Sequence, residues 1–171
     1  TVDDGQSYRI FDMDYGFEVA AVTTTGTVYH FNTNTGSMID KFPNPVPSQS
    51  HSFGKYLAIL DGTLYAAGTP DFNENNGPRY GAVYIMDYSR TLQPVLIKNP
   101  SPGTFSNFGD IVSAAGPGKV AVSRSGSNII YIYNMQGILV DTISGLSGIL
   151  SVKPSGGSQI AISHSNMISI Y

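Results

Sequence analysis

The sequence predicts an all-β protein with the architecture of a β-propeller, and three observations carry that prediction. One order of segments recurs four times: an apolar strand, a turn with glycine, a second apolar strand, a loop and a short aromatic strand. A repeat of roughly 40 to 55 residues made of short strands is the sequence signature of propeller blades. No segment longer than about ten residues shows apolar residues at helical spacing together with helix caps. We therefore expect four blades, each of four antiparallel strands.

The repeat is clearest when the second strand and the aromatic strand of each unit are aligned. In the later repeats, β-branched and aromatic residues alternate with small or polar ones, which is typical of half-buried strands. The four aligned pairs are 17–22 with 28–32, 64–67 with 83–87, 120–123 with 130–134, and 160–163 with 168–171.

These repeats predict a single propeller domain over residues 1–171. Two proline-containing segments, 43–50 and 99–103, are expected to connect blades, because proline cannot donate to the ladder of a central strand. The blades are then expected at about 7–42, 53–98, 108–143, and 148–171 together with 1–5.

The fourth repeat has no outer strand after its aromatic strand. Residues 1–4 resemble residues 139–142 of the third repeat, and both segments precede the first strand of a following repeat. We therefore expect residues 1–5 to supply the outer strand of the last blade, which would close the ring and remove an exposed sheet edge. Two alternatives stay open: the chain is part of a larger ring, or it is half of a ring that a second copy completes.

Composition excludes several classes of protein. Charged residues make up 12% of the chain, where about a quarter is usual, and Gly, Ser, Thr, Asn and Tyr take their place. The net charge is -3 and no two of the nine basic residues are adjacent, so we expect no nucleic-acid partner. The absence of cysteine excludes disulfides and thiolate metal sites. No apolar run approaches the ~20 residues that span a bilayer, so no membrane insertion is expected.

The second repeat carries specific marks. They are Phe53-Gly54, Gly68-Thr69-Pro70 and the segment 81–84, and Phe108-Gly109 repeats the first mark. These residues resemble an FG-GAP repeat of the integrin-α propeller type, which has Gly-Ala-Pro where this chain has Gly-Thr-Pro. Divergent repeats of this kind are also similar to sequences in marine bacterial surface proteins and phage structural proteins. The resemblance implies a propeller whose loops recognise other molecules, on a virion or on a cell surface.

Members of that family often carry a calcium loop between the first two strands of a blade. Only the first repeat approaches it, with Asp12 and Asp14 before Gly16 and with Glu18 beyond. Ca²⁺ takes six to eight oxygen ligands, which alternate carboxylates around a turn can supply. Asp12 and Asp14 are therefore the candidate metal ligands. We favour the simpler interpretation, a polar turn with solvated carboxylates and no cofactor.

The longest loop inside a blade covers residues 69–80 and is the candidate binding site. Loops on a rigid scaffold often carry function, and this loop combines hydrogen-bonding groups with two aromatic rings that could stack on a sugar or pack on a protein. Its spacing hints at a cation loop, but the glycine falls one position late for an EF-hand and no Glu closes it. A loop that only connects two strands is the alternative. The candidate residues are Asp71, Phe72, Asn73, Asn75, Asn76, Arg79 and Tyr80.

Tyrosine recurs in the third strand of the repeats. We expect these rings to fill the space between adjacent blades, with each hydroxyl reaching water or a backbone carbonyl. The residues are Tyr29, Tyr84, Tyr131 and Tyr133.

No catalytic constellation stands out. His30, His51 and His164 fall in different elements, and neither a Gly-x-Ser-x-Gly elbow nor a Walker loop occurs. We therefore predict a non-enzymatic binding, adhesion or structural module that contacts protein or glycan through the loops of one face. The rival is a small hydrolase or lyase with a polar pocket at the propeller axis, which needs several carboxylates or a histidine there. A third possibility is a building block of a larger assembly or a homo-oligomer.

Overall fold

The computed structural model describes residues 8–13, 18–23, 26–32, 34–47, 52–74, 77–103 and 106–171. For residues 8–13 and 18–23 the backbone alone is described. These residues form 15 strands in four antiparallel sheets, which confirms the all-β prediction. The described part of the chain contains no helix that could cross a membrane.

Each sheet is a meander of strands that are consecutive in the sequence. The first contains β1 (Tyr8–Met13), β2 (Glu18–Thr23), β3 (Thr27–Asn32) and β4 (Met38–Pro43). The second contains β5 (Tyr56–Ile59), β6 (Leu64–Thr69), β7 (Ala82–Asp87) and β8 (Val95–Lys98). The third contains β9 (Ile111–Ala114), β10 (Lys119–Ser123), β11 (Ile130–Asn134) and β12 (Leu139–Ile143). The fourth contains β13 (Ile149–Gly156), β14 (Gln159–His164) and β15 (Met167–Ile170).

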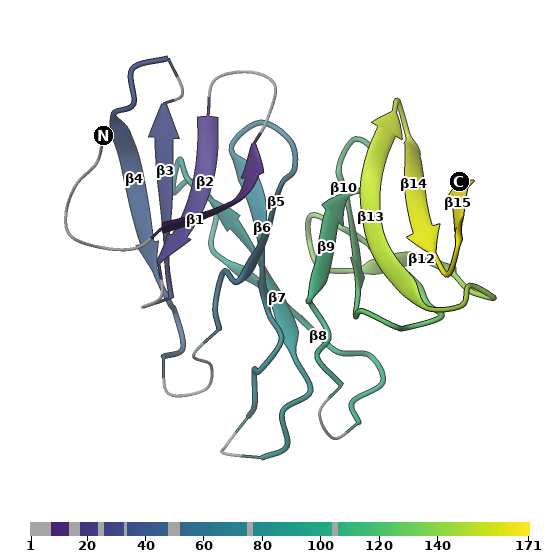
Figure 1. Cartoon of the computed structure of the whole chain (residues 1–171). Helices are drawn as coiled ribbons and strands as arrows, with labels where there is room; N and C mark the ends of the chain where they lie inside the picture. The colour runs from purple at the N-terminus through teal and green to yellow at the C-terminus, as the bar shows by residue number, and fades with distance from the viewer. Residues whose placement is uncertain are drawn as a thin grey trace.

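The first strands of the sheets lie closest to one another. β1 packs on β5, β5 on β9, and β9 on β13, so the sheets follow one another in chain order around these inner strands (Figure 1). Among the described strands, β13 and β1 pack on each other less than the other pairs of neighbouring inner strands do. Residues 1–5, which were expected to close the ring, lie outside the described residues.

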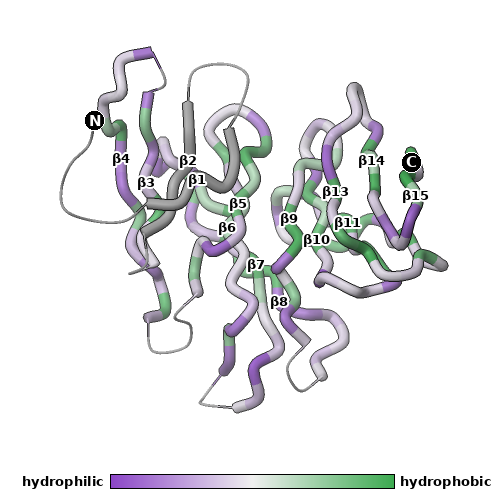
Figure 2. Tube along the Cα trace, in the orientation of Figure 1, coloured by the Kyte–Doolittle hydropathy of each residue, from purple (hydrophilic) through white to green (hydrophobic). Residues whose placement is uncertain are grey.

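The hydrophobic core lies between adjacent sheets. Figure 2 shows hydrophobic segments along the strands and hydrophilic ones in many of the connections. Three buried clusters fill the three joints between sheets: one is centred on Phe42, Phe53 and Tyr65, one on Val83, Phe108 and Val120, and one on Ile130, Ile149 and Ile162. Tyr84 belongs to the first cluster and Tyr133 to the second, so these two rings fill inter-sheet space as predicted. The hydroxyl of Tyr133 is buried and has no hydrogen-bond partner among the described residues, which differs from the expectation for that group.

The two Phe-Gly pairs have the same structural role. Phe53 and Phe108 are 1% and 2% exposed, and each precedes the first strand of its sheet. The following glycines adopt φ values of 71° and 93°, a region that favours glycine. The backbone N–H of Gly54 donates to the carbonyl of Gly68, as that of Gly109 donates to the carbonyl of Ser123, both at 3.0 Å. Each pair thus ties the start of its sheet to the end of the second strand.

Glycines also let two backbones touch at the joint between the second and third sheets. Gly81 forms a parallel bridge with Phe108, and a Cβ atom on Gly81 would overlap the carbonyl oxygen of Phe108. A Cβ atom on Gly68 would overlap the carbonyl oxygen of Gly109 in the same way. The close approach of these sheets therefore requires glycine at both positions.

Asp87 organises the turn after β7. Its carboxylate is 4% exposed and accepts hydrogen bonds from the hydroxyls of Thr63 at 2.6 Å and of Thr91 at 2.7 Å. The side chain of Ser89 and the backbone N–H groups of Ser89, Thr91 and Leu92 also donate to it. Burial disfavours the charge, but the hydrogen bonds from Thr63, Thr91 and Ser89 outweigh burial and hold the pKa of Asp87 well below its usual range.

His30 lies in an aromatic environment between the first two sheets. The imidazole is 3% exposed, and its centroid lies 5.8 Å from that of Phe42, 4.7 Å from that of Tyr65 and 4.9 Å from that of Tyr88. Burial lowers the pKa of His30 to about 4, against the opposing charge of Asp40. A neutral, buried histidine among three aromatic rings is part of the core.

Candidate functional site

Three connections meet on one face of the molecule, which we call the loop face: the described residues of the ranges 70–81, 99–110 and 124–129. The first two extend below the sheets in Figure 1. They meet at the carbonyl of Tyr80, which accepts hydrogen bonds from the Ser106 hydroxyl at 2.6 Å and from the Asn99 side chain at 3.0 Å. Asp110 joins the third connection, because its carboxylate accepts the backbone N–H of Ser125 at 2.6 Å. The loop face is therefore one bonded unit.

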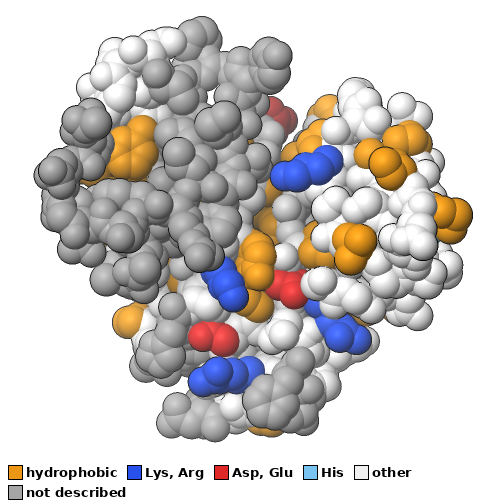
Figure 3. Space-filling view, viewed as in Figure 1, with side chains coloured by type: hydrophobic (Ala, Val, Ile, Leu, Met, Phe, Trp, Pro, Cys, Tyr) orange, Lys and Arg blue, Asp and Glu red, His pale blue; other side chains and the backbone are white. Residues whose placement is uncertain are grey.

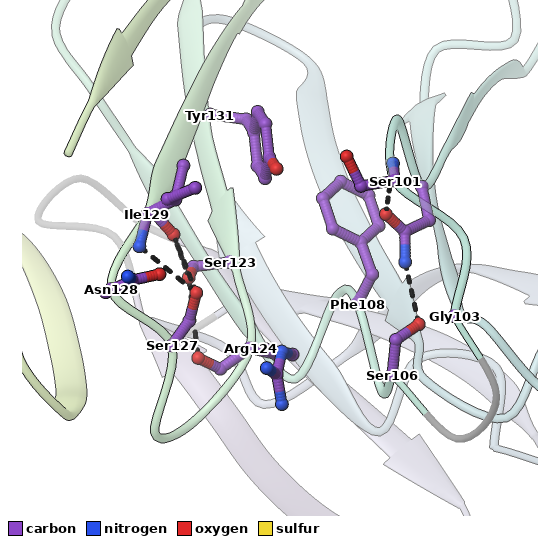
Figure 4. Close-up of a pocket in the computed structure, with 11 residues that line it drawn as sticks. Ser101, Gly103, Ser106, Phe108, Ser123, Arg124, Ser127, Asn128, Ile129 and Tyr131 are labelled. Carbon is purple, nitrogen blue, oxygen red and sulfur yellow. Dashed lines mark hydrogen bonds between the residues drawn. The ribbon is translucent and has the colours of Figure 1, made fainter.

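A pocket of about 360 Å³ opens on the loop face between the second and third sheets. One wall comes from the connection between β8 and β9 and the other from the end of β10, its connection to β11 and the start of β11 (Figure 4). The described lining residues are Asn99, Ser101, Gly103, Ser106 and Phe108 on the first wall, and Ser123, Arg124, Ser127, Asn128, Ile129 and Tyr131 on the second. We call this pocket the inter-sheet pocket. Its volume lies at the lower end of the range of small-molecule sites, and it is large enough to enclose one or two side chains of a partner.

Two aromatic rings give the inter-sheet pocket an apolar part. Phe108 is 2% exposed and packs edge-to-face on the half-buried ring of Tyr131, with centroids 5.9 Å apart. Because Phe108 is enclosed, the ring of Tyr131 is the aromatic surface that a ligand can reach.

Several polar side chains of the pocket are already used to build its walls. The hydroxyls of Ser123 and Ser127 donate to the carbonyl of Ile129 at 2.6 and 3.2 Å. Across the pocket, the Asn99 amide donates to the Ser106 hydroxyl at 2.7 Å, and Figure 4 shows both arrangements. These groups fix the two loops and leave little hydrogen-bonding capacity for a ligand.

Three exposed side chains remain available: Ser101 on one wall, and Arg124 and Asn128 on the other. Arg124 forms no ion pair within the described part of the chain. The guanidinium of Arg124 interacts electrostatically with the carboxylate of Asp110. Burial raises the pKa of Asp110, while the hydrogen bond from Ser125 and the charges of Arg124 and Lys55 oppose that shift.

The predicted binding loop lies beside this pocket, and most of its described side chains pack on the protein. Asp71 accepts the backbone N–H of Ser52 at 3.2 Å as well as the Ser52 hydroxyl, and Asn73 is half-buried. Arg79 is exposed. Tyr80 is half-buried, and burial, followed by a hydrogen bond with Glu74, raises its pKa. Asn75 and Asn76 lie outside the described residues.

Phe72 requires a correction. The sequence interpretation gave its ring a role in stacking on a sugar or a partner, but Phe72 is 1% exposed. Its ring packs edge-to-face on Tyr80 with centroids 6.0 Å apart, and its carbonyl accepts the backbone N–H groups of Tyr80 and Gly81. Phe72 therefore anchors the loop from inside, because burying an aromatic ring is more favourable than exposing it.

The predicted calcium ligands, Asp12 and Asp14, are not tested by the structure. Asp14 lies outside the described residues, and for Asp12 the side chain is not described. Within the described ranges, no group of three or more His, Asp or Glu side chains could bind a metal ion. His51 is not described, and His164 lies in the fourth sheet, where its Nε2 is 2.8 Å from the Ser169 hydroxyl.

Two further pockets lie along the inner strands, where the rival enzyme would have its active site. One, of about 230 Å³, is lined by β5, β9 and β13 and contains Asp110 and Lys153. The other, of about 360 Å³, lies at the opposite ends of these strands and contains Asp61. Figure 3 shows the hollow between the two halves of the molecule, with charged side chains around it. Among the described residues that line these two pockets, each pocket has a single Asp and no histidine.

Sequence reasoning missed the inter-sheet pocket. In the third repeat, Ser123-Arg124-Ser125 stands where the second repeat has Gly68-Thr69-Pro70. A usable signal was nevertheless present, because 69–80 and 124–129 both connect the second and third strands of neighbouring repeats. In adjacent antiparallel sheets of one topology, equivalent connections emerge on the same face, which is the signal that would have placed these two polar loops side by side.

No family model and no curated protein match this chain. Several solved structures are similar to it in fold. A chain in the crystal structure of a mitotic checkpoint complex aligns over 99% of this chain and 49% of its own length, with a TM-score of 0.67 and 11% identity. The WD40 repeats of RRP9 align over 98% of this chain and 51% of theirs, with a TM-score of 0.62 and 11% identity. U3-55K aligns over 96% and 51%, with a TM-score of 0.58 and 10% identity.

These likenesses show the fold. The chain has the β-propeller architecture that its repeats predict, and it spans about half the length of the solved chains it matches. Identities of 10 to 11% carry no conclusion about activity or partners. The resemblance to FG-GAP repeats stays a prediction.

Proposed function

We propose that this propeller is a non-enzymatic module that binds another protein through the loop face. The inter-sheet pocket carries this proposal, because it combines a reachable aromatic ring with three exposed polar side chains on walls fixed by internal hydrogen bonds. Arg79 is exposed, and it precedes Tyr80, whose carbonyl is bonded to Ser106 in the pocket wall. Exposed polar and aromatic groups on a rigid support are typical of protein-contact sites.

The proposal also covers the location of the module and the alternatives to protein binding. We place the module on a virion or a cell surface, which the FG-GAP resemblance and the low charged fraction of 12% support. Glycan is the second ligand class that the loop composition suggests. The rival hydrolase or lyase has less support, because the described lining of each inner pocket brings together one Asp and no histidine.

Site-directed crosslinking tests the loop face. The chain has no cysteine, so Arg79→Cys introduces a single site for a photocrosslinker on the loop face. Lys119→Cys is the matched control, since Lys119 is also an exposed basic residue but begins β10 at the opposite end of the sheet. In an extract or particle preparation of the source, we expect crosslinks to one reproducible protein from position 79 at several-fold higher yield than from position 119. Equal yields, or no crosslinks from position 79, would overturn the proposal.

We also propose that residues 1–5 pair with β15 and that the chain forms a four-bladed ring. The support is the outer edge of β15, which has no partner strand among the described residues and carries Ile168 at 75% and Ile170 at 52% exposure. The rival arrangement is a half-ring completed by a second copy, which the half-length match to larger propellers favours.

Engineered disulfides separate these arrangements. Asp3→Cys is combined in turn with a cysteine at each of the four positions of β15 (Met167–Ile170), so that the series covers both facings and the possible registers. An intrachain disulfide in a particle of monomer mass, measured by light scattering, is expected in at least one variant. A disulfide-linked dimer would establish the two-copy ring in its place, and no disulfide in any of the variants would reject the pairing.

A further inference from the structure

We propose that the inter-sheet pocket binds an acidic side chain of the partner protein, with the carboxylate on Arg124 and the neighbouring apolar atoms on Tyr131. This inference rests on the proposed protein-binding function of the loop face and names the chemistry that the partner presents there.

The first argument is charge. The described lining of the inter-sheet pocket contains Arg124 and no Asp or Glu, so its local charge is positive although the whole chain carries -3. Lys98 immediately precedes Asn99 of the pocket wall, but its Nζ forms an ion pair with Oε1 of Glu74 at 2.5 Å. The carboxylate of Asp110 interacts electrostatically with Arg124, but Asp110 does not line this pocket, and its Oδ1 accepts the backbone N–H of Ser125. A guanidinium presents paired N–H donors that match the two oxygens of a carboxylate.

The second argument is that the remaining polar side chains of the pocket can all act as hydrogen-bond donors. Ser101 and Asn128 face the pocket from opposite walls, and neither side chain forms a hydrogen bond within the described part of the chain. Together with Arg124 they offer a hydroxyl, an amide and a guanidinium, which can all donate. An ionised carboxylate only accepts hydrogen bonds, so it is the group that this set satisfies best.

The third argument favours a peptide over an acidic sugar. Sugar recognition uses many hydroxyl partners, but the hydroxyls of Ser106, Ser123 and Ser127 are bonded within the walls. Phe108 is enclosed, so one ring face is available for stacking and not two. The pocket volume of about 360 Å³ has room for the methylene stem of Glu and part of an adjacent apolar side chain against Tyr131.

An array of short acetylated and amidated peptides tests the inference. Each peptide with one Glu or Asp between apolar residues is printed beside its Gln or Asn counterpart, and an array of sialylated and uronic-acid glycans serves as the comparison. The wild-type protein is expected to prefer the acidic peptides. Arg124→Gln should reduce that binding about tenfold, the size expected for one charge-assisted pair. Lys119→Gln, an exposed basic residue at the opposite end of β10, is the matched control and should bind as the wild type does.

The outcomes separate this inference from the function on which it rests. No preference for acid over amide, equal losses in both variants, or Arg124-dependent binding to acidic glycans alone would overturn the inference. If crosslinking from position 79 then still identifies one protein, the loop face binds protein by other chemistry. If both experiments fail, the proposed function falls with the inference.

Discussion

Replacing Gly68 with alanine should lower the free energy of unfolding by about 3 kcal/mol or more. The added Cβ would overlap the carbonyl oxygen of Gly109 and would lie 3.2 Å from the Cβ of Tyr56. The first obstacle is backbone, which cannot turn away as a flexible side chain would. Gly109 is itself fixed by the hydrogen bond from its N–H to Ser123, so relieving the overlap must move the third sheet away from the second.

Urea unfolding followed by circular dichroism measures this effect. Gly103→Ala is the matched control, because Gly103 also lacks a positive φ and its Cβ would meet nothing within 4 Å. We expect the control to change the free energy of unfolding by less than about 0.5 kcal/mol, as surface substitutions usually do. Similar losses in both variants would show that the two sheets do not meet at Gly68.

Replacing Asp87 with alanine should cost about 3 kcal/mol or more. The change leaves the hydroxyls of Thr63 and Thr91 and the backbone N–H groups of the turn without their buried acceptor. Because the carboxylate accepts hydrogen bonds from several donors at once, among them the hydroxyl of the half-buried Thr63, the loss exceeds that of a single hydrogen bond. Asp61→Ala, at an exposed position before β6, is the control and should change stability little.

Asp87 also predicts a dependence on pH. Its pKa is lower in the folded chain than the 3.8 expected when unfolded, so the folded state keeps the carboxylate ionised at a pH where the unfolded state binds a proton. The stabilisation is fully present above pH 3.8 and is lost as the pH falls through the folded value. Asp87→Asn should be less stable at neutral pH and should lose less stability on acidification below 3.8 than the wild type does. Parallel curves for the two proteins would contradict the prediction.

The strands were predictable because their alternation is local. The repeat units 64–67 with 83–87 and 120–123 with 130–134 fall on β6, β7, β10 and β11. Each strand hydrogen-bonds to its sequence neighbour, so the sheets follow from consecutive segments. The number of blades in a closed ring depends on the angle between sheets, which no local pattern encodes.

Asp87 was overlooked although the sequence contained a signal. It aligns with Asn32 and Asn134 at the end of the aromatic strand, and the side chains of all three accept backbone N–H groups of the next turn. Asp and Asn are favoured at such turns for that reason. The additional contact between Asp87 and Thr63 comes from another connection, so the burial of the carboxylate could not be read from the repeat.

The candidate site was predicted in part. Residues 69–80 were identified as the longest loop of a blade, but the pocket beside them combines side chains from two repeats. Arg124 and Tyr131 come from the third repeat, and Ser101 comes from the connection before it. Phe72 was misjudged because length and polarity suggest an exposed loop, whereas one aromatic side chain is enough to fold such a loop onto the core.

The glycine contacts between the second and third sheets have a consequence for recognition. Main chain rests on main chain there, so no rotamer change can alter the spacing of the second and third sheets, and Phe108 in the pocket lining is held by that contact. A ligand would meet a receptor surface already shaped before the encounter, and association would lose little entropy in ordering the protein. Selectivity would then depend on the fit of the incoming group to a fixed aperture.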